Sequence, residues 1–277
     1  GEVASTQVAI VGGGPAGLLL AHLLHARGIE SVVLEARGRE HLEGRVRAGV
    51  LEHGTVEILA GLGLDARLRR EGLMHRGIEL AFAGARRRLD LADLTGGKVV
   101  TVYGQQEVVK DLIAARLAQG APLLFEAEGV AIEGIDGERP LVRYRHDGRE
   151  HVLRCAIVAG CDGFHGIARA SLPAGAIQTV ERVYPFAWLG ILAAAPPAAE
   201  ELIYASHERG FALLSMRSPA ITRAYLQCAP DEDLAAWPDA RIWDELDARL
   251  TGEGAPPLHR GPVLQKGVTA MRSFVAA

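Results

Sequence analysis

Apolar and polar positions at the start of the chain fall into short runs of two kinds. Residues 7–11 are β-rich and stop at glycines, and residues 16–26 carry helix formers with no breaker before Gly28. Residues 31–34 form a second short β-rich run that ends at Glu35. A strand, a helix and a strand within about thirty residues make a βαβ unit. The pattern therefore predicts an α/β fold.

The patterning changes once along the remaining chain. Before residue 172 there are helical patterns at residues 51–62, 66–71 and 106–119, and strand-like pieces at 78–82, 87–91, 99–103 and 153–159, the last apolar enough for a buried strand. After Pro173, turn signals separate four β-rich runs at residues 183–192, 201–205, 211–215 and 223–227, with no helix between them. These runs predict an antiparallel sheet from about residue 172 to 230, followed by a helix at 238–250 and a returning strand.

Composition narrows the class of protein. The chain has 277 residues, 49% of them hydrophobic, and a net charge of −4 with both signs interspersed, so we expect a globular protein and no nucleic-acid partner. Cys155, Cys161 and Cys228 have no metal-ligand spacing, which predicts reduced thiols and no metal. The longest uncharged run, residues 183–199, carries three prolines and is short for a bilayer span, and the N-terminus lacks the order of a signal peptide. We therefore expect a cytoplasmic protein without a membrane partner.

A glycine loop joins the first strand to the first helix. Gly12, Gly14 and Gly17 have the G-x-G-x-x-G spacing, which serves a tight turn, close backbone approach to a pyrophosphate and close helix packing. The helix N-terminus offers N–H groups to the phosphates, and Glu35 is placed to bind a ribose. An acid at that position favours FAD or NAD over NADP. The motif itself leaves the choice between FAD and NAD open.

Longer segments carry a specific resemblance. They include GGGPAGLLLAHLLHARGI, LEGRVRAGVLEHG, ELAFAGARRRLDL, GGKVVTVYGQQEV, AGCDGFHGIAR, ERVYPFAWLG, ELIYASHERGFAL and MRSFV. Together, in order from residue 7 to 275, they resemble the flavin-dependent aromatic hydroxylases. The resemblance implies a Rossmann-like FAD-binding domain at residues 1–172, with a substrate-side insertion near 75–100. It also implies an antiparallel-sheet substrate domain at residues 173–277, which includes the start of the return to the FAD domain.

The resemblance also assigns dinucleotide contacts. For FAD it implies the three loop glycines and Glu35, together with Arg47, Gln105, Asp162, Gly163 and Arg223. For the reduced nicotinamide it implies Arg45, Phe164, His165, Arg169 and Arg272. Selectivity for the additional phosphate is ascribed in the family to the segment after Glu35. This segment departs from the best-known pattern at Ala36 but offers Arg37, Arg39 and His41, so we expect NADPH as co-substrate, with NADH still open.

The implied substrate is a small aromatic acid. Tyr204, Ser215, Arg217 and Tyr225 match the family's substrate contacts, and an arginine flanked by hydroxyls suits a planar carboxylate. The implied reaction is hydroxylation of 4-hydroxybenzoate to 3,4-dihydroxybenzoate through a flavin C4a-hydroperoxide. Tyr204 would draw off the phenolic proton, and His75 matches a surface histidine at the end of that proton relay.

Several alternatives remain at this point. The family carries a further Gly-Asp segment, a pocket proline and a second relay tyrosine that do not occur before Ala277, so we expect the chain to lack the C-terminal helical part and to retain FAD weakly. A sister hydroxylase for another phenolic acid and a poorly active or non-catalytic dinucleotide-binding module compete with the main hypothesis. A nicotinamide dehydrogenase is the least favoured alternative. A homodimer is an expectation from the family alone.

Overall fold

The computed structural model describes residues 3–252 and 257–276 and divides the chain into two compact units. The first unit, here the loop unit, comprises Gly1–Val50, Gly54–Gly72 and Tyr103–Ile177. The second, here the sheet unit, comprises Leu51–His53, Leu73–Val102 and Gln178–Ala277. The boundary after residue 172 stays a prediction about domains.

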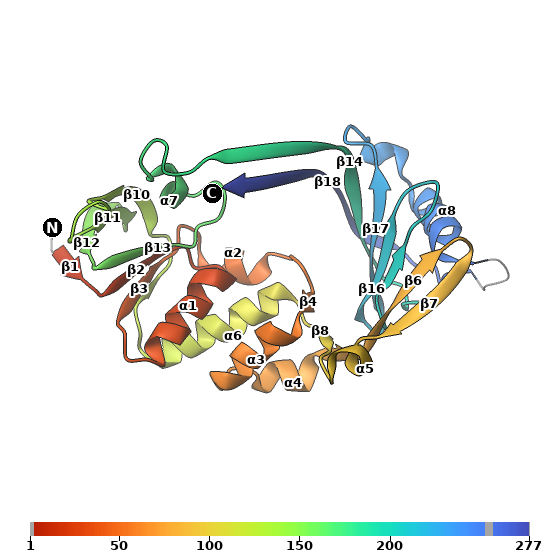
Figure 1. The fold of residues 1–277 in the computed structure, drawn as a ribbon, viewed down its shortest axis with the longest axis horizontal. Helices are drawn as coiled ribbons and strands as arrows, with labels where there is room; N and C mark the ends of the chain where they lie inside the picture. Colours follow the sequence, from red (N-terminus) through yellow and green to blue (C-terminus); the bar gives the residue numbers. More distant parts are fainter. Residues whose placement is uncertain (1–2, 253–256, 277) are drawn as a thin grey trace. The chain divides into compact units, whose positions relative to one another are not determined.

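The loop unit is built around a four-stranded parallel sheet. Its order is β13 (Ile157–Gly160), β2 (Val8–Val11), β3 (Ser31–Leu34) and β9 (Leu123–Leu124). All four residues of β2 are buried, as expected for a strand covered on both faces. Helices α1 (Pro15–His25) and α6 (Gln105–Ala118) lie side by side in Figure 1, and α1 packs on β2 and β3. The predicted βαβ unit is thus β2–α1–β3.

A second sheet of the loop unit has no counterpart in the prediction. Its order is β1 (Val3–Ser5), β12 (Arg149–Arg154), β11 (Leu141–His146) and β10 (Glu128–Glu133). Residues Val142, Tyr144 and Leu153 of this sheet share a core with Ala9 and Val11 of β2. Charged residues are interspersed along its strands, as in the sequence REHVLR of β12, so these strands contain no long apolar run that would predict them.

The buried strand expected at residues 153–159 is wrong. The β structure is interrupted at Cys155 and Ala156. Strand β12, before the interruption, belongs to one sheet, and β13, after it, belongs to another. At the break, the Cys155 N–H donates to Pro140 O and the Ala156 N–H donates to Gln7 O, each at 3.0 Å. The run is apolar because Leu153 and Cys155 fill the core between the two sheets, whereas Ile157 is 60% exposed.

The chain also forms shorter elements outside these two sheets. They are α2 (Arg39–Gly44), β4 (Val50–Leu51), α3 (His53–Gly61), α4 (Ala66–Glu71), β5 (Leu73–His75), β8 (Val100–Val102) and α7 (Ile167–Ala170). The helix expected at residues 51–62 is therefore shorter and preceded by a strand, which joins a three-stranded sheet in the order β4-β8-β5. In the described part of the chain, no helix has the length and apolar character needed to cross a membrane.

The sheet unit contains one seven-stranded sheet. Its order is β18 (Val263–Ala276), β14 (Thr179–Ala193), β17 (Ile221–Cys228), β16 (Ala212–Ser218), β15 (Ile203–Ala205), β6 (Gly77–Phe82) and β7 (Ala85–Asp90). All neighbours are antiparallel except β15 and β6, which are parallel. The predicted antiparallel sheet is therefore extended through β15 by two strands that come from much earlier in the chain. The predicted strand at 87–91 ends at Asp90, because Leu91 begins helix α5 (Leu91–Thr95).

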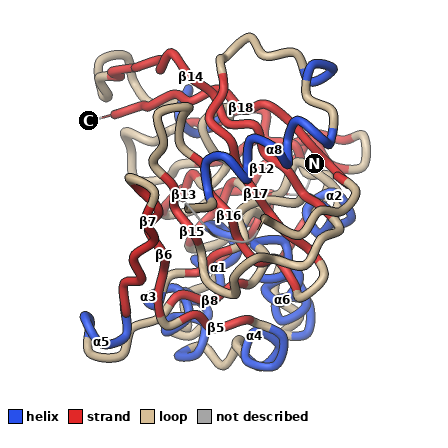
Figure 2. Tube along the Cα trace, turned by 90° about the vertical axis from the view of Figure 1, so that its right-hand side faces the viewer, coloured by secondary structure: helices blue, strands red, loops and turns tan. Residues whose placement is uncertain are grey.

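One face of this sheet carries the core of the unit. Along β14, the residues Ala187, Leu189, Ile191 and Ala193 are buried, and their neighbours are only partly covered. Helix α8 (Asp239–Leu250), preceded by the short 3₁₀ helix η1 (Leu234–Ala236), covers the buried face in Figures 1 and 2. Because side chains alternate along a strand, the other residues of β14 to β17 share the opposite face. We call this opposite face the open face.

Candidate active site

At the glycine loop, the backbone of Gly12 lies close to the segment at Cys161 and to the first turn of α1 at Gly17. Gly12 has a φ of 108°, and a Cβ on it would overlap the carbonyl of Cys161 at the end of β13. A Cβ on Gly17 would overlap the carbonyl oxygen of Gly12. Both positions therefore require glycine, one for its conformation and both for packing.

Gly14 has a different role in the loop. It is the N-cap of α1, no side chain caps this end, and a Cβ on Gly14 would meet no described atom within 4 Å. The first turn of α1 therefore presents N–H groups to an open space. A phosphate fits such a site, because the N–H groups and the positive end of the helix dipole both favour an anion.

Glu35 lies beside the same loop, at the end of β3. Its Oε2 accepts a hydrogen bond from the Gly13 N–H at 2.6 Å, and its Oε1 accepts one from the Arg37 N–H at 2.9 Å. The residue is 8% exposed. Each carboxylate oxygen still has acceptor capacity for a ribose hydroxyl. These contacts orient the acid as the sequence analysis requires of a ribose ligand.

The segment after β13 forms a compact turn. Asp162 Oδ2 accepts a hydrogen bond from the Ala168 N–H at 3.1 Å and so caps α7, and a Cβ on Gly166 would overlap its carboxylate. Gly163 has a φ of 76°. The Arg169 guanidinium lies 4.2 Å from the centroid of the Phe164 ring, a cation–π arrangement.

The remaining predicted dinucleotide residues lie in both units. His165 contacts the Phe164 ring edge to face at 4.9 Å. Arg45 ends α2, Arg47 follows it, and both are exposed. Gln105 begins α6, and its N–H donates to Ala48 O at 2.9 Å. Arg272 belongs to the sheet unit, on β18, with its Nη1 3.8 Å from Glu181 Oε1.

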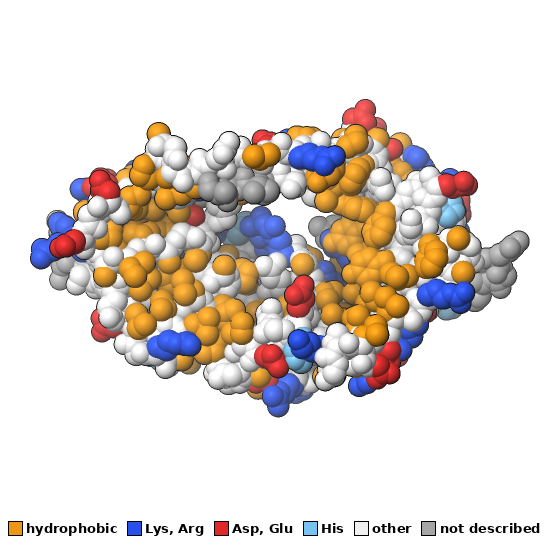
Figure 3. Space-filling model, viewed as in Figure 1, with side chains coloured by type: hydrophobic (Ala, Val, Ile, Leu, Met, Phe, Trp, Pro, Cys, Tyr) orange, Lys and Arg blue, Asp and Glu red, His pale blue; other side chains and the backbone are white. Residues whose placement is uncertain are grey.

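The predicted substrate residues share the open face of the sheet unit. They are Tyr204 on β15, Ser215 and Arg217 on β16, and Tyr225 on β17. Arg223 of β17, which is a predicted FAD contact, lies on the same face. Tyr204 and Tyr225 both pair with Leu213, and Ser215 pairs with Arg223, so these residues fall in adjacent rows across three strands. The register therefore brings together five side chains from three separate segments. Hydrophobic side chains gather around β14, β16 and β17 in the space-filling view (Figure 3).

Two guanidinium groups give this face a positive character. Arg223 donates to Tyr225 Oη through Nε at 3.1 Å and Nη2 at 2.9 Å. Burial, and then the charge of Arg223, lower the pKa of Arg217. A carboxylate beside the two arginines would offset their repulsion. The face is therefore chemically suited to an aromatic acid.

Aromatic rings border Tyr204 on the open face. The Phe211 centroid lies 6.2 Å from that of Tyr204 and 5.1 Å from that of Trp188. Phe211 is fixed in turn, because its N–H donates to Gln227 Oε1 at 2.9 Å. Phe211 and Trp188 were not predicted, since single aromatic residues in β-rich runs do not indicate a shared face.

The expected surface position of His75 is wrong. The residue is 5% exposed, and within the described residues its Nδ1 has no hydrogen-bond partner. Burial lowers its pKa, and the nearby carboxylates of Glu201 and Glu200 act in the opposite direction. His75 lines a pocket of about 470 Å³ together with Met74, Arg76, Glu79, Arg88, Glu200 and Glu201. His75 is buried because its strand, β5, pairs with β8. The three-residue sequence of β5 is too short to predict this pairing.

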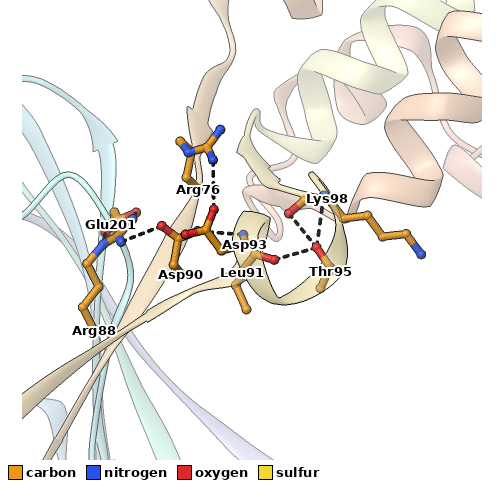
Figure 4. Close-up of polar contacts among 8 residues, drawn as sticks. All are labelled: Arg76, Arg88, Asp90, Leu91, Asp93, Thr95, Lys98 and Glu201. Atoms are coloured by element: carbon orange, nitrogen blue, oxygen red, sulfur yellow. Dashed lines mark hydrogen bonds and ion pairs between the residues drawn. The ribbon is translucent and has the colours of Figure 1, made fainter.

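A polar network that the local sequence does not predict lies near this pocket. Arg88 on β7 makes two hydrogen bonds to Glu201, and Asp90 caps α5 by accepting from the Asp93 N–H (Figure 4). The two partners of the main pair are 113 residues apart. The basic run at residues 86–88 indicates that an acidic partner could exist, but no local sequence feature identifies Glu201 as that partner.

Comparison with known proteins adds independent findings. Residues 5–277 match the family model described as FAD binding domain. The p-hydroxybenzoate hydroxylase of Acinetobacter baylyi is 46% identical over 274 residues, which cover 99% of this chain and 68% of the relative. A probable NADH-specific resorcinol 4-hydroxylase of Rhodococcus jostii is 28% identical over 171 residues, or 60% of this chain and 32% of the relative.

Solved structures agree on the fold. The p-nitrophenol 4-monooxygenase PnpA of Pseudomonas putida has a TM-score of 0.83 at 18% identity, and the match covers all of this chain and 70% of that one. PqsL of Pseudomonas aeruginosa, a probable FAD-dependent monooxygenase, has a TM-score of 0.74 at 21% identity over 93% of this chain and 73% of that one. Together with the family match, these similarities confirm the predicted fold class of a Rossmann-like FAD-binding domain joined to a sheet domain.

Proposed function

Because this chain belongs to the FAD-binding-domain family and is an FAD-dependent aromatic hydroxylase, we propose that it converts 4-hydroxybenzoate to 3,4-dihydroxybenzoate with NADPH and dioxygen. The observation that carries the proposal is the set of two arginines, two tyrosines and a serine on the open face. The 46% identity to a p-hydroxybenzoate hydroxylase supports the choice of substrate.

The residues of the loop unit fit FAD. The open space at Gly14 and the uncapped start of α1 suit the pyrophosphate, and Glu35 suits the adenosine ribose. Arg47, Gln105, Asp162 and Gly163 are the further proposed contacts in the loop unit, and Arg223 of the sheet unit is proposed as another. When bound, FAD supplies the redox chemistry, accepting hydride from the nicotinamide and activating dioxygen.

The open face accounts for binding and orienting the substrate. In the proposal, Arg217 holds the carboxylate through paired hydrogen bonds, with support from the hydroxyls of Ser215 and Tyr225. Tyr204 accepts a hydrogen bond from the substrate phenol and, as it takes up the phenolic proton, passes its own hydroxyl proton on toward His75. The loss of the phenolic proton makes the ring richer in electrons at the position to be hydroxylated. Burial lowers the pKa of His75 and so favours its neutral imidazole, the form that can accept a proton.

The proposed nicotinamide contacts come from both units. Arg45, Phe164, His165, Arg169 and Arg272 are the proposed contacts. The Phe164–Arg169 stack offers an aromatic face and a cation in one place, which suits a ring with an adjacent phosphate. NADPH remains the preferred co-substrate, with NADH the alternative that a kinetic comparison would decide. A homodimer remains a prediction.

Replacing Tyr204 with Phe tests the chemical proposal. Tyr184 is a suitable control, because it is another partly buried tyrosine of the same sheet. We expect Tyr204→Phe to keep substrate-stimulated NADPH oxidation but to form at least about tenfold less product per NADPH, with the remainder as hydrogen peroxide. Tyr184→Phe should behave as the unmodified protein. Undiminished hydroxylation by Tyr204→Phe would refute the role of Tyr204, and hydroxylation of a different phenolic acid in a substrate panel would refute the choice of substrate.

A further inference from the structure

The position of Tyr204 depends on a very short strand. Strand β15 has three residues, and it pairs with β6 in parallel, Ile203 opposite Glu79 and Tyr204 opposite Leu80. A slip of one residue would turn Tyr204 toward the α8 face and bring a neighbouring apolar residue to the open face. On its other edge, β15 pairs with β16 in a hairpin, with Tyr204 opposite Leu213. The parallel pair with β6 joins two distant segments and has no connecting turn to set its register.

A bidentate ion pair joins the two segments at this point. Arg88 Nε lies 2.6 Å from Glu201 Oε1, and Arg88 Nη2 lies 2.9 Å from Glu201 Oε2 (Figure 4). Glu201 precedes β15 by two residues. Arg88 is paired in the β6–β7 hairpin with Glu79, the same residue that pairs with Ile203. The ion pair therefore spans from β7, across β6, to the entrance of β15.

The backbone of β6 makes room for this pair. A Cβ on Gly77 would lie 2.8 Å from Arg88 Nη2 and 2.5 Å from the carbonyl oxygen of Leu89. The Gly77 N–H also donates to Glu201, and this bond together with the stronger one from Arg88 holds the pKa of Glu201 below its usual range. Gly77 thus serves both partners of the pair.

The outer side of the pair is also supported. Arg88 Nη1 lies 3.2 Å from Asp90 Oδ2, and Asp90 Oδ1 accepts from the Asp93 N–H at 2.9 Å. Arg76 lies 3.7 Å from Asp93 (Figure 4). The end of β7 and the start of α5 therefore fix the backbone from which Arg88 extends. The fork geometry of a guanidinium on a carboxylate restricts direction as well as distance.

We propose that Arg88 and Glu201 are positioning residues that set the register of β15 and so hold Tyr204 on the open face. The effect on catalysis rests on the proposed function, whereas the effect on register does not. Because Arg88 is 44% exposed at its side chain, solvent screens the pair and its contribution is modest. We expect its loss to raise local opening of β15 by about three- to tenfold, without unfolding the sheet unit.

Hydrogen exchange of the full chain tests how firmly β15 is held in the sheet. In Arg88→Ala, the backbone amides of Ile203–Ala205 should exchange about three- to tenfold faster, with amides of β14 and β17 unchanged. Arg88→Lys, which keeps the charge but lacks the fork, should show most of the same effect. Arg143→Ala is the matched control, because the Arg143 side chain is about as exposed as that of Arg88 and pairs with Glu133 at 2.9 Å in the loop unit. Unchanged exchange at β15 in Arg88→Ala would overturn the proposal.

A second measurement tests whether the pair acts through Tyr204. Arg88→Ala should lower the fraction of NADPH oxidation that yields hydroxylated product, and this loss should disappear in a Tyr204→Phe background. The charge-swapped double variant, Arg88→Glu with Glu201→Arg, should restore part of the lost yield of hydroxylated product per NADPH oxidised. Additive losses on combining Arg88→Ala with Tyr204→Phe would overturn the link to Tyr204. If the unmodified protein hydroxylates no phenolic acid, the proposed function fails, and the exchange experiment still decides whether the pair sets the register.

Discussion

The glycine loop offers a sharp prediction, because two of its glycines differ in what surrounds them. A Cβ on Gly17 would lie much closer to the carbonyl oxygen of Gly12 than the 3.0 Å below which real Cβ contacts essentially never occur. The same Cβ would lie 3.1 Å from Ile10 Cγ2. A Cβ on Gly14 would meet no described atom within 4 Å. The same substitution at positions three residues apart should therefore have different effects.

The magnitude for Gly17→Ala follows from packing. The methyl group and the Gly12 carbonyl must separate by about 1 Å or more, and overpacking of a close contact costs about 1–3 kcal/mol or more. Alanine regains about 1 kcal/mol of helix propensity within α1. Since the neighbour is backbone and cannot rotate away, we expect a net loss of about 2 kcal/mol. This corresponds to a decrease in Tm of about 4–8 °C for a chain of this size.

Gly14→Ala should leave stability within about 1 kcal/mol, since alanine is a poorer N-cap than glycine but restricts the unfolded chain. Its methyl group would instead enter the space proposed for the pyrophosphate, and FAD affinity should fall about tenfold or more. Thermal unfolding followed by circular dichroism without added FAD measures the first effect, and titration followed by quenching of flavin fluorescence measures the second. Equal loss of stability in both variants, or unmodified FAD affinity in Gly14→Ala, would refute the reasoning.

Three further predictions concern buried groups. Arg116→Met should lower the free energy of unfolding by about 3 kcal/mol in urea titrations, because the buried guanidinium donates to Ser31 O at 2.8 Å and to Pro122 O at 3.1 Å; a loss below about 1 kcal/mol would contradict this. Burial lowers the pKa of His22, so the unfolded chain binds the proton more readily. The contribution of His22 to the free energy of unfolding should be complete above about pH 6.5 and should decline below it by up to about 1.4 kcal/mol per pH unit. The slope of stability against pH should be smaller in His22→Gln, and an unchanged slope in that variant would contradict the prediction. Burial also raises the pKa of all three thiols, so a thiol reagent at pH 7.5 should label them rapidly only after unfolding, whereas rapid labelling of the native protein would disprove their protection.

Much of the site was available from local sequence because its chemistry follows strand and loop patterns. The glycine spacing, the apolar run before it and Glu35 after β3 are adjacent in sequence and remain adjacent in space. Alternation along β16 and β17 likewise puts Ser215, Arg223 and Tyr225 on one face without any long-range information. The sheet formed by β1, β12, β11 and β10 was not predicted, because its strands contain too many charged residues to form recognisable apolar runs.

What the sequence by itself determined is the class of fold, the dinucleotide loop and the face on which each predicted substrate residue lies, since periodicity and glycine geometry act over a few residues. The tertiary structure alone decided the burial of His75, the break between β12 and β13, and the parallel pairing of β15 with β6. Each of these depends on contacts between segments far apart in the chain. Such contacts are selected by the packing of whole sheets, and no local pattern encodes which distant strand or carboxylate will be the partner.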